Sequence, residues 1–173
     1  VIGTRGTVES ARFRKLLSAH GQSVQFHVQA CDGLAGAIER STLQQPASAG
    51  EASEIEALSA RYIRTLGQFG LKTGEMDTLV LGCTPYIFIK EELRALLGPE
   101  VQLIDTGAPV ARQTRRLLAQ QHSLRPEPAQ TPADAQAQAH QIRLMTTGAL
   151  ASLQAAAQRW LQLPASCCAA VQV

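Results

Sequence analysis

Apolar positions along the chain follow two periods, one typical of strands and one typical of helices. Residues 23–30 alternate at every second position, whereas residues 78–81 form a continuous apolar run, which suits a parallel sheet covered on both faces. The predicted strands are residues 23–30, 78–81, 101–104 and 142–145. Helical periodicity predicts helices at residues 8–19, 34–39, 51–69, 91–97, 109–121 and 149–161. This order of elements predicts an α/β fold, with a mostly parallel sheet flanked by helices.

Three segments fall outside this pattern. Residues 44–50, rich in Gln, Pro, Ala, Ser and Gly, predict a loop, and residues 122–140, dominated by Pro, Ala and Gln, predict a solvated linker or insertion. The tail after Pro164 has no recognisable pattern. At the other end, Val1-Ile2-Gly3-Thr4 has the character of a strand end that runs into a turn, so we expect the chain to begin inside an element.

Composition narrows the classes of function. The chain has 173 residues, 45% of them hydrophobic, which is enough for one globular domain or for one domain and part of another. Its net charge of +2 comes from 16 basic and 14 acidic residues mixed along the sequence, and aromatic residues make up only 4%, so a nucleic-acid interface is not expected. No apolar run approaches the roughly 18 residues of a membrane helix. We therefore expect a small molecule or another protein as the partner, and a reducing cytoplasm as the compartment.

Three predicted strand-to-helix turns share hydroxyl groups and glycines. They are residues 3–7 (Gly-Thr-Arg-Gly-Thr), 82–84 (Gly-Cys-Thr) and 105–107 (Asp-Thr-Gly). In α/β sheets such turns gather at the carboxyl ends of the strands, where ligands bind. Unpaired N–H groups at a helix start suit a carboxylate or a phosphate. The alternative is that Thr and Gly serve there only as caps and turn formers.

The four cysteines, Cys31, Cys83, Cys167 and Cys168, have no metal-ligand spacing, so we expect neither a metal site nor a disulfide. Cys83 stands where an apolar strand turns into a helix. Because a helix start stabilises a thiolate, Cys83 is a candidate base or nucleophile. Its alternative role is that of a small buried apolar side chain. Cys31 is expected to be a turn residue, and Glu39 by itself a solvated carboxylate.

Four segments, in order and at fitting separations, resemble the carboxyl-terminal part of bacterial glutamate racemases. They are VIGTRGTV, VQACDGLAGAIE, MDTLVLGCTPY and VQLIDTGAPVARQTRRLL. This similarity covers residues 1 to about 119, and LMTTGALASLQAAAQRWL is similar to the closing strand and helix of that family. The strand that ends in Leu-Gly-Cys-Thr is the most specific of these elements.

The resemblance implies an aspartate/glutamate racemase-like fold, with two similar α/β lobes and the substrate between them. Residues 1–105 would form the second lobe, which carries Cys83. Residues 106–163 would complete the first lobe through a returning helix, the linker at 122–140 and a final strand and helix, and residues 164–173 would form a tail. The family's amino-terminal half, with its own catalytic cysteine, is expected to be missing from this sequence.

The resemblance also implies a racemase that makes D-glutamate from L-glutamate for peptidoglycan, without a cofactor or a metal. In that family two cysteines face opposite sides of the substrate Cα, and one removes a proton while the other supplies one. Cys83 matches the second of these cysteines, and Glu39 matches an acidic position that supports a catalytic group. The positions that match substrate-binding residues are Thr4, Thr7, Thr84 and Pro85.

One position departs from the family pattern. The family reads Cys-Thr-His-Tyr-Pro where this chain has Cys83-Thr84-Pro85-Tyr86-Ile87, so the histidine that assists the cysteine is replaced by a residue without an N–H group. Two alternatives therefore stay open beside glutamate racemisation. One is a catalytically inactive racemase-like binding or interaction domain, and the other is a related racemase that acts on aspartate or a hydantoin. The sequence also leaves a homodimer open.

Overall fold

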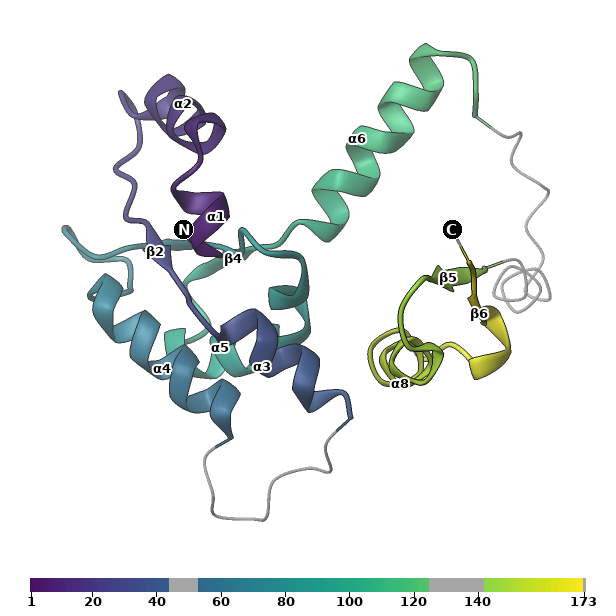
Figure 1. The fold of residues 1–173 in the computed structure, drawn as a ribbon. Coiled ribbons are helices and arrows are strands. Elements are labelled where there is room, and N and C mark those ends of the chain that lie inside the picture. Colours follow the sequence, from purple (N-terminus) through teal and green to yellow (C-terminus); the bar gives the residue numbers. More distant parts are fainter. Residues whose placement is uncertain (44–52, 125–141, 173) are drawn as a thin grey trace. The chain divides into compact units, whose positions relative to one another are not determined.

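The structure is a computed structural model of the chain, and it describes residues 1–43, 53–124 and 142–172 (Figure 1). Its contacts divide the chain into two compact units. Unit 1 contains Val1–Ser41 and Gln45–Thr114, and unit 2 contains Thr42–Gln44 and Arg115–Val173. All six residues that the resemblance assigns to the site lie in unit 1.

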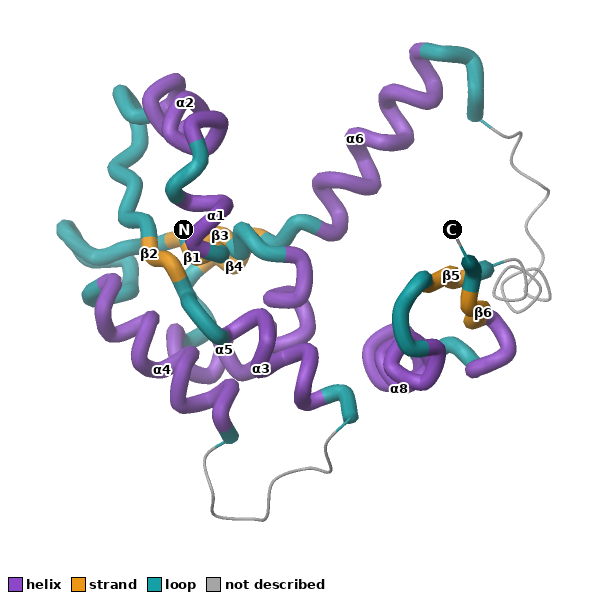
Figure 2. The backbone as a smooth tube through the Cα atoms, viewed as in Figure 1, coloured by secondary structure: helices purple, strands orange, loops and turns teal. Residues whose placement is uncertain are grey.

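Parallel strands form the centre of the described part of unit 1 (Figure 2, orange). They are β1 (Ile2–Gly3), β2 (Gln29–Ala30), β3 (Thr78–Val80) and β4 (Gln102–Ile104). β1 pairs with β2, and β3 pairs with β4. A parallel bridge between Ile2 and Leu81 joins the two pairs, and the N–H of Gly82 donates to the Ile2 carbonyl oxygen at 2.7 Å. The strands therefore run in the order β2–β1–β3–β4 with their carboxyl ends at one edge, which confirms the predicted α/β class.

Local signals in the sequence set the helix boundaries of unit 1. Its helices are α1 (Arg5–Val8), α2 (Ala11–His20), α3 (Leu34–Ser41), α4 (Glu54–Leu66), the 3-10 helix η1 (Thr84–Ile89), α5 (Lys90–Leu97) and the first part of α6 (Gly107–Gln120). Ser53 starts α4 with a capping box, because its side chain accepts from the Glu56 N–H at 3.2 Å and the Glu56 carboxylate accepts from the Ser53 N–H at 2.8 Å. Gly98 ends α5 with a φ of +83°, which glycine adopts without strain.

The core of unit 1 lies between the strands and the helices α3, α4, α5 and η1, which pack against one another. Leu79 and Leu81 of the β3 segment are fully buried, as are Leu34 and Ile38 of α3 and Leu93 of α5. Burial of each such side chain contributes about 1.5–3 kcal/mol. Leu79 and Leu81 are two positions apart in an extended segment and so face the same side. They anchor the carboxyl end of β3 in the core.

The predicted strand over residues 23–30 is wrong for most of its length. Pairing is limited to Gln29 and Ala30, while Val24 and Val28 are 50% and 38% exposed. In the parallel register Ile2 lies opposite Gln29, so the residues before Gln29 would need partners that precede β1. The alternating pattern is present, but among the described residues no strand pairs with positions 23–28.

One predicted helix is divided in the structure, and two predicted irregular segments lie largely outside the described residues. The predicted helix over residues 8–19 forms as α1 and α2, because the hydroxyl of Ser10 accepts from the Phe13 N–H at 3.1 Å and starts a second helix. The predicted loop at 44–50 lies outside the described residues, as does most of the predicted linker at 122–140. The other predicted helices and strands form at or near their predicted positions.

The described part of unit 2 contains a strand–helix–strand arrangement. Its elements after α6 are β5 (Leu144–Thr146), α8 (Leu150–Leu161), the 3-10 helix η2 (Ala165–Cys167) and β6 (Cys168–Ala170). β5 and β6 pair in parallel, with Leu144 opposite Cys168, and α8 contacts both strands. The tail after Pro164 therefore contains regular structure that the sequence did not indicate. Its elements are three residues long, too short for a periodic pattern to be detected.

Ser59 of α4 offers a test of the core packing. It is 1% exposed, and its Oγ has no hydrogen-bond partner in the described structure. Because a buried unpaired hydroxyl carries a desolvation cost, we expect Ser59→Ala to raise the free energy of unfolding by about 1 kcal/mol, measured by urea denaturation. Ser41→Ala is the matched control, since the Ser41 Oγ donates to the Ile38 carbonyl at 2.7 Å and its removal should lower stability. A Ser59→Ala protein less stable than the parent would contradict this packing.

Candidate active site

Four turns at the carboxyl edge of the sheet carry the polar and thiol groups of the site. Thr4 follows β1, Cys31 follows β2, Cys83 follows the β3 segment and Asp105 follows β4. Because β1 and β3 are neighbours through the Ile2 bridge, the turns that hold Thr4 and Cys83 are adjacent. The structure thus brings together two of the predicted turns that are distant in sequence.

Cys83 lies at the junction between the β3 segment and η1. Its backbone is extended, with φ −136° and ψ 137°, and its carbonyl accepts from the Tyr86 N–H at 3.1 Å. Its side chain is half-buried. Gly82 allows this junction to lie close to β1. A Cβ added at Gly82 would lie only 2.9 Å from the Ile2 carbonyl oxygen. A residue without a side chain is therefore required directly before Cys83.

Burial raises the pKa of the Cys83 thiol, the backbone N–H of Thr84 lowers it, and the negative charge of Glu39 raises it. The helix that follows is a 3-10 helix of six residues, and Pro85 near its start has no N–H group to offer. The stabilised thiolate expected from a helix start is therefore not what this structure provides. The net pKa lies above that of a free cysteine, so Cys83 is a protonated thiol at neutral pH.

Thr4 and Thr7 form a pair of hydroxyl groups on the neighbouring turn. Thr4 precedes α1, its Oγ1 lies 3.0 Å from the Thr7 Oγ1, and the Thr7 N–H donates to the Thr4 carbonyl at 2.9 Å. Thr7 is exposed and Thr4 half-buried. The pair can offer both a donor and an acceptor to a polar ligand at the end of β1.

The remaining predicted site residues are Thr84, Pro85 and Glu39. Thr84 is exposed at the first position of η1, and Pro85 follows it, half-buried. Glu39 is exposed on α3, and its charge acts on the Cys83 thiol. Thr84 and Pro85 thus follow Cys83 directly, and Glu39 of α3 influences its thiol by charge.

Arg5 makes an ion-pair network that the sequence did not indicate. Its Nε and Nη2 bind the two carboxylate oxygens of Asp32 at 3.2 and 2.5 Å, and its Nη1 binds Glu9 at 2.7 Å. The hydrogen bond to Asp32 is the main reason why the pKa of Arg5 is raised above its ordinary value. The three side chains are more than half exposed, so the pairs add little to stability. Their forked geometry links the turn after β1 to the turn after β2.

Cys31 lies in the turn after β2, where its carbonyl accepts from the Leu34 N–H at 3.3 Å, and it is also a core residue. It is 1% exposed, and burial raises its pKa to about 12. The reason is that helices cover the turn: the Tyr86 hydroxyl from η1 donates to the Cys31 carbonyl at 3.4 Å, and the Tyr62 hydroxyl from α4 donates to the Asp32 carbonyl at 2.7 Å. The sequence carries no local signal for the contact between Tyr86 and Cys31, because the two residues are far apart along the chain.

Asp105 closes the edge of the sheet at β4. Its Oδ2 accepts from Lys90 Nζ at 2.9 Å, and its Oδ1 accepts from the Gly107 N–H at 3.0 Å. The Lys90 hydrogen bond is the largest cause of a lowered Asp105 pKa. The pair joins the start of α5 to the turn that begins α6.

Asp105→Asn is expected to lower the free energy of unfolding by about 0.5 kcal/mol at neutral pH, since the Lys90 side chain is partly exposed. The pKa of Asp105 is lower in the folded chain than in the unfolded chain, so its contribution is present above the unfolded value of roughly 4 and is lost as pH falls through the folded value. Thermal unfolding of both proteins over acidic and neutral pH measures this difference. A constant difference at all pH values would contradict the ion pair, and Lys90→Gln should give the same loss.

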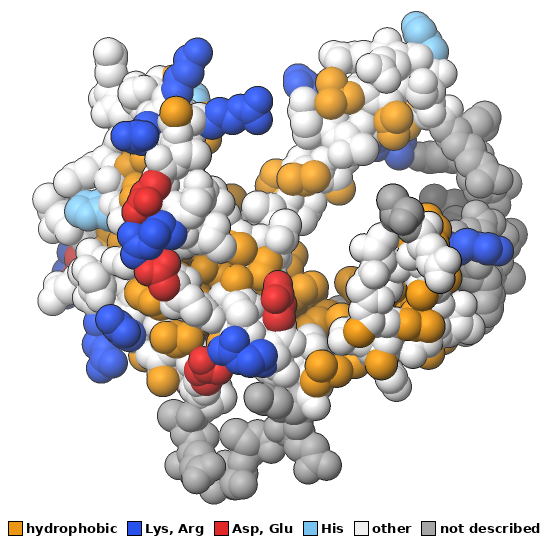
Figure 3. Space-filling view, viewed as in Figure 1, with side chains coloured by type: hydrophobic (Ala, Val, Ile, Leu, Met, Phe, Trp, Pro, Cys, Tyr) orange, Lys and Arg blue, Asp and Glu red, His pale blue; other side chains and the backbone are white. Residues whose placement is uncertain are grey.

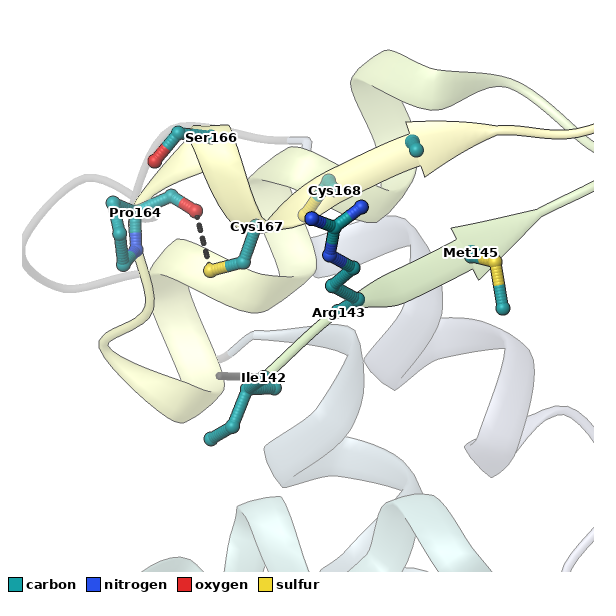
Figure 4. A pocket seen from close by; sticks show the side chains of 8 residues that line it. Ile142, Arg143, Met145, Pro164, Ser166, Cys167 and Cys168 are labelled. Carbon is teal, nitrogen blue, oxygen red and sulfur yellow. Dashed lines mark hydrogen bonds between the residues drawn. The ribbon is translucent and has the colours of Figure 1, made fainter. Parts of the chain in front are cut away.

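Possible metal ligands and a cavity are further features of the described residues. In them, no group of three or more His, Cys, Asp or Glu side chains is placed to hold a metal ion. A cavity of about 280 Å³ lies in unit 2, where Arg143, Met145, Cys167 and Cys168 are among its lining residues (Figure 4). It contains none of the residues that the resemblance assigns to the site.

Surface charge and the length of the described helices are relevant to the kinds of partner that this chain could bind. Figure 3 shows acidic and basic side chains next to one another on the face of unit 1 that it draws, in keeping with a net charge of +2. A search of the described residues found no helix both long enough and apolar enough to cross a membrane.

Comparison with known proteins gives consistent matches. The chain is 42% identical over 130 residues to a glutamate racemase of Ectopseudomonas mendocina, a match that covers 75% of this chain and 45% of the relative. A glutamate racemase of Herpetosiphon aurantiacus is also 42% identical over 130 residues, covering 75% and 46%. No family model matches the chain. The chain thus spans a little less than half the length of these curated relatives.

Two solved structures are similar to the fold. A glutamate racemase isoform from Bacillus anthracis matches 99% of this chain and 56% of its own with a TM-score of 0.70, and at 23% identity it supports the fold alone. The Escherichia coli glutamate racemase, solved with L-glutamate and the activator UDP-MurNAc-Ala, matches 75% of this chain and 44% of its own with a TM-score of 0.54 and 28% identity. By sequence and by fold, the chain is similar to glutamate racemases, of which it matches about half the length.

Proposed function

We propose that this chain carries one of the two acid/base groups of a cofactor-independent glutamate racemase, and that the whole protein interconverts L- and D-glutamate. The observation that carries the proposal is a half-buried thiol, Cys83, at the carboxyl edge of a parallel sheet, next to the hydroxyl pair of Thr4 and Thr7. Racemase relatives, one of them solved with L-glutamate, support glutamate as the substrate.

The chemistry assigned to Cys83 is proton transfer at the glutamate Cα. The thiolate removes the α-proton and becomes a thiol, and the electron pair of the broken C–H bond moves onto the substrate carboxylate. The hydroxyls of Thr4, Thr7 and Thr84 are assigned to the carboxylate, where negative charge develops. Return of a proton from the same thiol restores the starting enantiomer. Inversion therefore needs a second group on the opposite face, which in the family is another cysteine.

Glu39 is proposed as a supporting residue. Its carboxylate is close enough for its charge to raise the pKa of Cys83, so it favours the protonated thiol. This suits the half of the reaction in which Cys83 supplies a proton. In the other half Cys83 must first become a thiolate, and for that reason the exchange rate should rise with pH.

The direct test is exchange of the glutamate α-proton with solvent. The chain is incubated with L-glutamate, D-glutamate or L-aspartate in deuterated water, and deuterium at Cα is followed by NMR. Exchange with glutamate and much slower exchange with aspartate supports the proposal. Faster exchange with aspartate than with glutamate would mean that aspartate is the substrate. No exchange with any of the three amino acids would contradict the proposal.

A second candidate function is an inactive racemase-like binding domain. Two observations favour it: Pro85 stands where the family has a histidine, and burial raises the pKa of the Cys83 thiol. Such a domain would bind glutamate equally well before and after Cys83→Ala, measured by calorimetric titration, and neither protein would exchange the α-proton. Loss of exchange with binding retained in Cys83→Ala alone would identify an enzyme.

Substitution of Pro85 tests the departure from the family pattern. We expect Pro85→His to raise the exchange rate about tenfold or more, because an imidazole beside Cys83 can take up the thiol proton. Pro85→Ala is the matched control, since it restores the backbone N–H without the imidazole. A Pro85→His protein no faster than Pro85→Ala would contradict an assisting role for the imidazole. Both rates come from the same deuterium assay.

The wider context follows from the same proposal. Residues 1–105 are assigned to the second racemase lobe, and residues 106–163 to the elements that complete the first lobe. The terminal segment, residues 164–173, adds η2 and β6 to these elements. The D-glutamate produced would serve peptidoglycan synthesis in the cytoplasm and so cell-wall biogenesis and cell shape. A homodimer is compatible with this role, and sedimentation of the whole protein would establish its oligomeric state.

A further inference from the structure

The chain contains two tyrosines, and their hydroxyls bind consecutive carbonyl groups of one turn. Tyr86 donates to the carbonyl of Cys31 at 3.4 Å, and Tyr62 donates to the carbonyl of Asp32 at 2.7 Å. They come from different elements, η1 and α4, and reach the turn after β2. Tyr86 is 0% exposed and Tyr62 is 8% exposed.

Tyr86 differs from Tyr62 in its link to Cys83. Its N–H donates to the Cys83 carbonyl at 3.1 Å, so one residue binds Cys83 through its backbone and Cys31 through its side chain. The Cys31 N–H in turn donates to the Gly3 carbonyl at 2.9 Å, and the Gly82 N–H donates to the Ile2 carbonyl at 2.7 Å. These four hydrogen bonds close a ring that joins Cys83 to the ends of β1 and β2.

We infer that Tyr86 is a positioning residue that holds Cys83 at the carboxyl edge of the sheet, through its hydroxyl bond to Cys31 and its backbone bond to Cys83. This inference deepens the proposed function. It rests on that function only for the expected effect of Tyr86 on catalysis. Without the Tyr86 hydroxyl, the Cys31 carbonyl keeps one other donor, the Leu34 N–H at 3.3 Å, and the ring opens on the η1 side. The turn that holds Cys83 then keeps its bonds to the strands but loses its side-chain link to the turn after β2.

The groups around this ring define what else can act on Cys83. Glu39 of α3 acts on the Cys83 thiol by its charge, and Cys31, Cys83 and Tyr62 act on Tyr86. Burial is the largest cause of a Tyr86 pKa above its ordinary value. The Tyr86 hydroxyl therefore remains a donor throughout the physiological pH range. Tyr86→Phe therefore removes a hydrogen bond and no charge.

The test compares Tyr86→Phe with Tyr62→Phe. Each loses one tyrosine-to-carbonyl hydrogen bond to the same turn, and both should be less stable than the parent in thermal unfolding. Iodoacetamide labelling of Cys83, read by peptide mass spectrometry over a range of pH, reports how often the turn opens. We expect Tyr86→Phe to raise the labelling rate of Cys83 about two- to tenfold and to shift its pH profile downward, because an opened thiol is better hydrated. Tyr62→Phe should leave the labelling rate of Cys83 and its pH profile unchanged. The labelling of Cys167 in the same sample serves as the internal reference.

Equal labelling of Cys83 in Tyr86→Phe and Tyr62→Phe would overturn the inference, because loss of stability alone would then explain any change. The labelling needs no substrate, so it can succeed where the exchange assay fails, and the two proposals are separated in this way. If the parent chain exchanges the α-proton, Tyr86→Phe should lower kcat and leave KM within about twofold, since the hydroxyl does not contact substrate. A change in KM alone would contradict a positioning role.

Discussion

Cys83→Ser is expected to slow exchange of the glutamate α-proton by about 100-fold or more, because a hydroxyl is a far weaker acid than a thiol and general acid/base catalysis contributes at least this factor. Serine keeps the size of the side chain, so the turn between Gly82 and Thr84 should retain its conformation. The rate is measured as deuterium incorporation at Cα, and the fold is checked by circular dichroism.

Cys167→Ser is the matched control for this substitution. Cys167 is also a half-buried thiol, but it belongs to unit 2 and its Sγ donates to the Pro164 carbonyl at 3.0 Å. Its replacement should leave the exchange rate unchanged. If Cys83→Ser kept the parent rate, or if Cys167→Ser lost it, the assignment of the acid/base group to Cys83 would be wrong.

Gly82→Ala is expected to lower the free energy of unfolding by about 1–3 kcal/mol, the usual cost of overpacking a site that cannot expand. The added Cβ would lie 2.9 Å from the Ile2 carbonyl oxygen, which already accepts the Gly82 N–H at 2.7 Å. Relief of this clash requires β1 and β3 to move apart where Thr4 and Cys83 are brought together. The exchange rate should therefore fall along with stability. Urea denaturation measures the first effect and the deuterium assay the second.

Gly6→Ala provides the comparison for Gly82→Ala. Gly6 lies in α1 on the same edge of unit 1, and a Cβ added there would meet no atom within 4 Å. This substitution should keep or slightly raise stability, since alanine favours a helix over glycine. Equal stability of the two variants would contradict the close approach of β1 and β3.

Much of the fold could be predicted from the sequence because its signals are local. The apolar run at 78–81 and the period of α4 predict their elements directly, and the capping box at Ser53 adds the start of a helix. The strand over 23–30 could not be judged in this way, because pairing depends on which neighbour is present. The tail after Pro164 was missed because a three-residue strand carries no period.

The site was predicted in part for the same reason. The thiol of Cys83 stands at a visible junction of apolar run and helix, and the motif around it resembles a known family. What the sequence could not provide is burial, which raises the pKa of Cys83 and outweighs the short helix that follows. Nor could it provide contacts over long separations, such as Tyr86 with Cys31 or Arg5 with Asp32, because these depend on how strand ends meet.

Pro85 lies close to Cys83 in the sequence and gives the thiol little help in losing its proton. A proline has neither a side chain that could take the thiol proton nor an N–H that could stabilise a thiolate. The remaining influences on Cys83 are burial, one N–H from Thr84 and the charge of Glu39. They leave a protonated thiol, well suited to supply a proton and slower to remove one.

The stereochemistry of exchange tests the central claim most directly. L- and D-glutamate are incubated separately with the chain in deuterated water, and each product is analysed for configuration by chiral chromatography and for deuterium by mass spectrometry. A single thiol on one face of Cα predicts deuterium in one enantiomer, with its configuration retained, and little in the other. Deuterium in both enantiomers at similar rates, or exchange accompanied by inversion, would contradict the claim that this chain supplies one face of a two-group racemase.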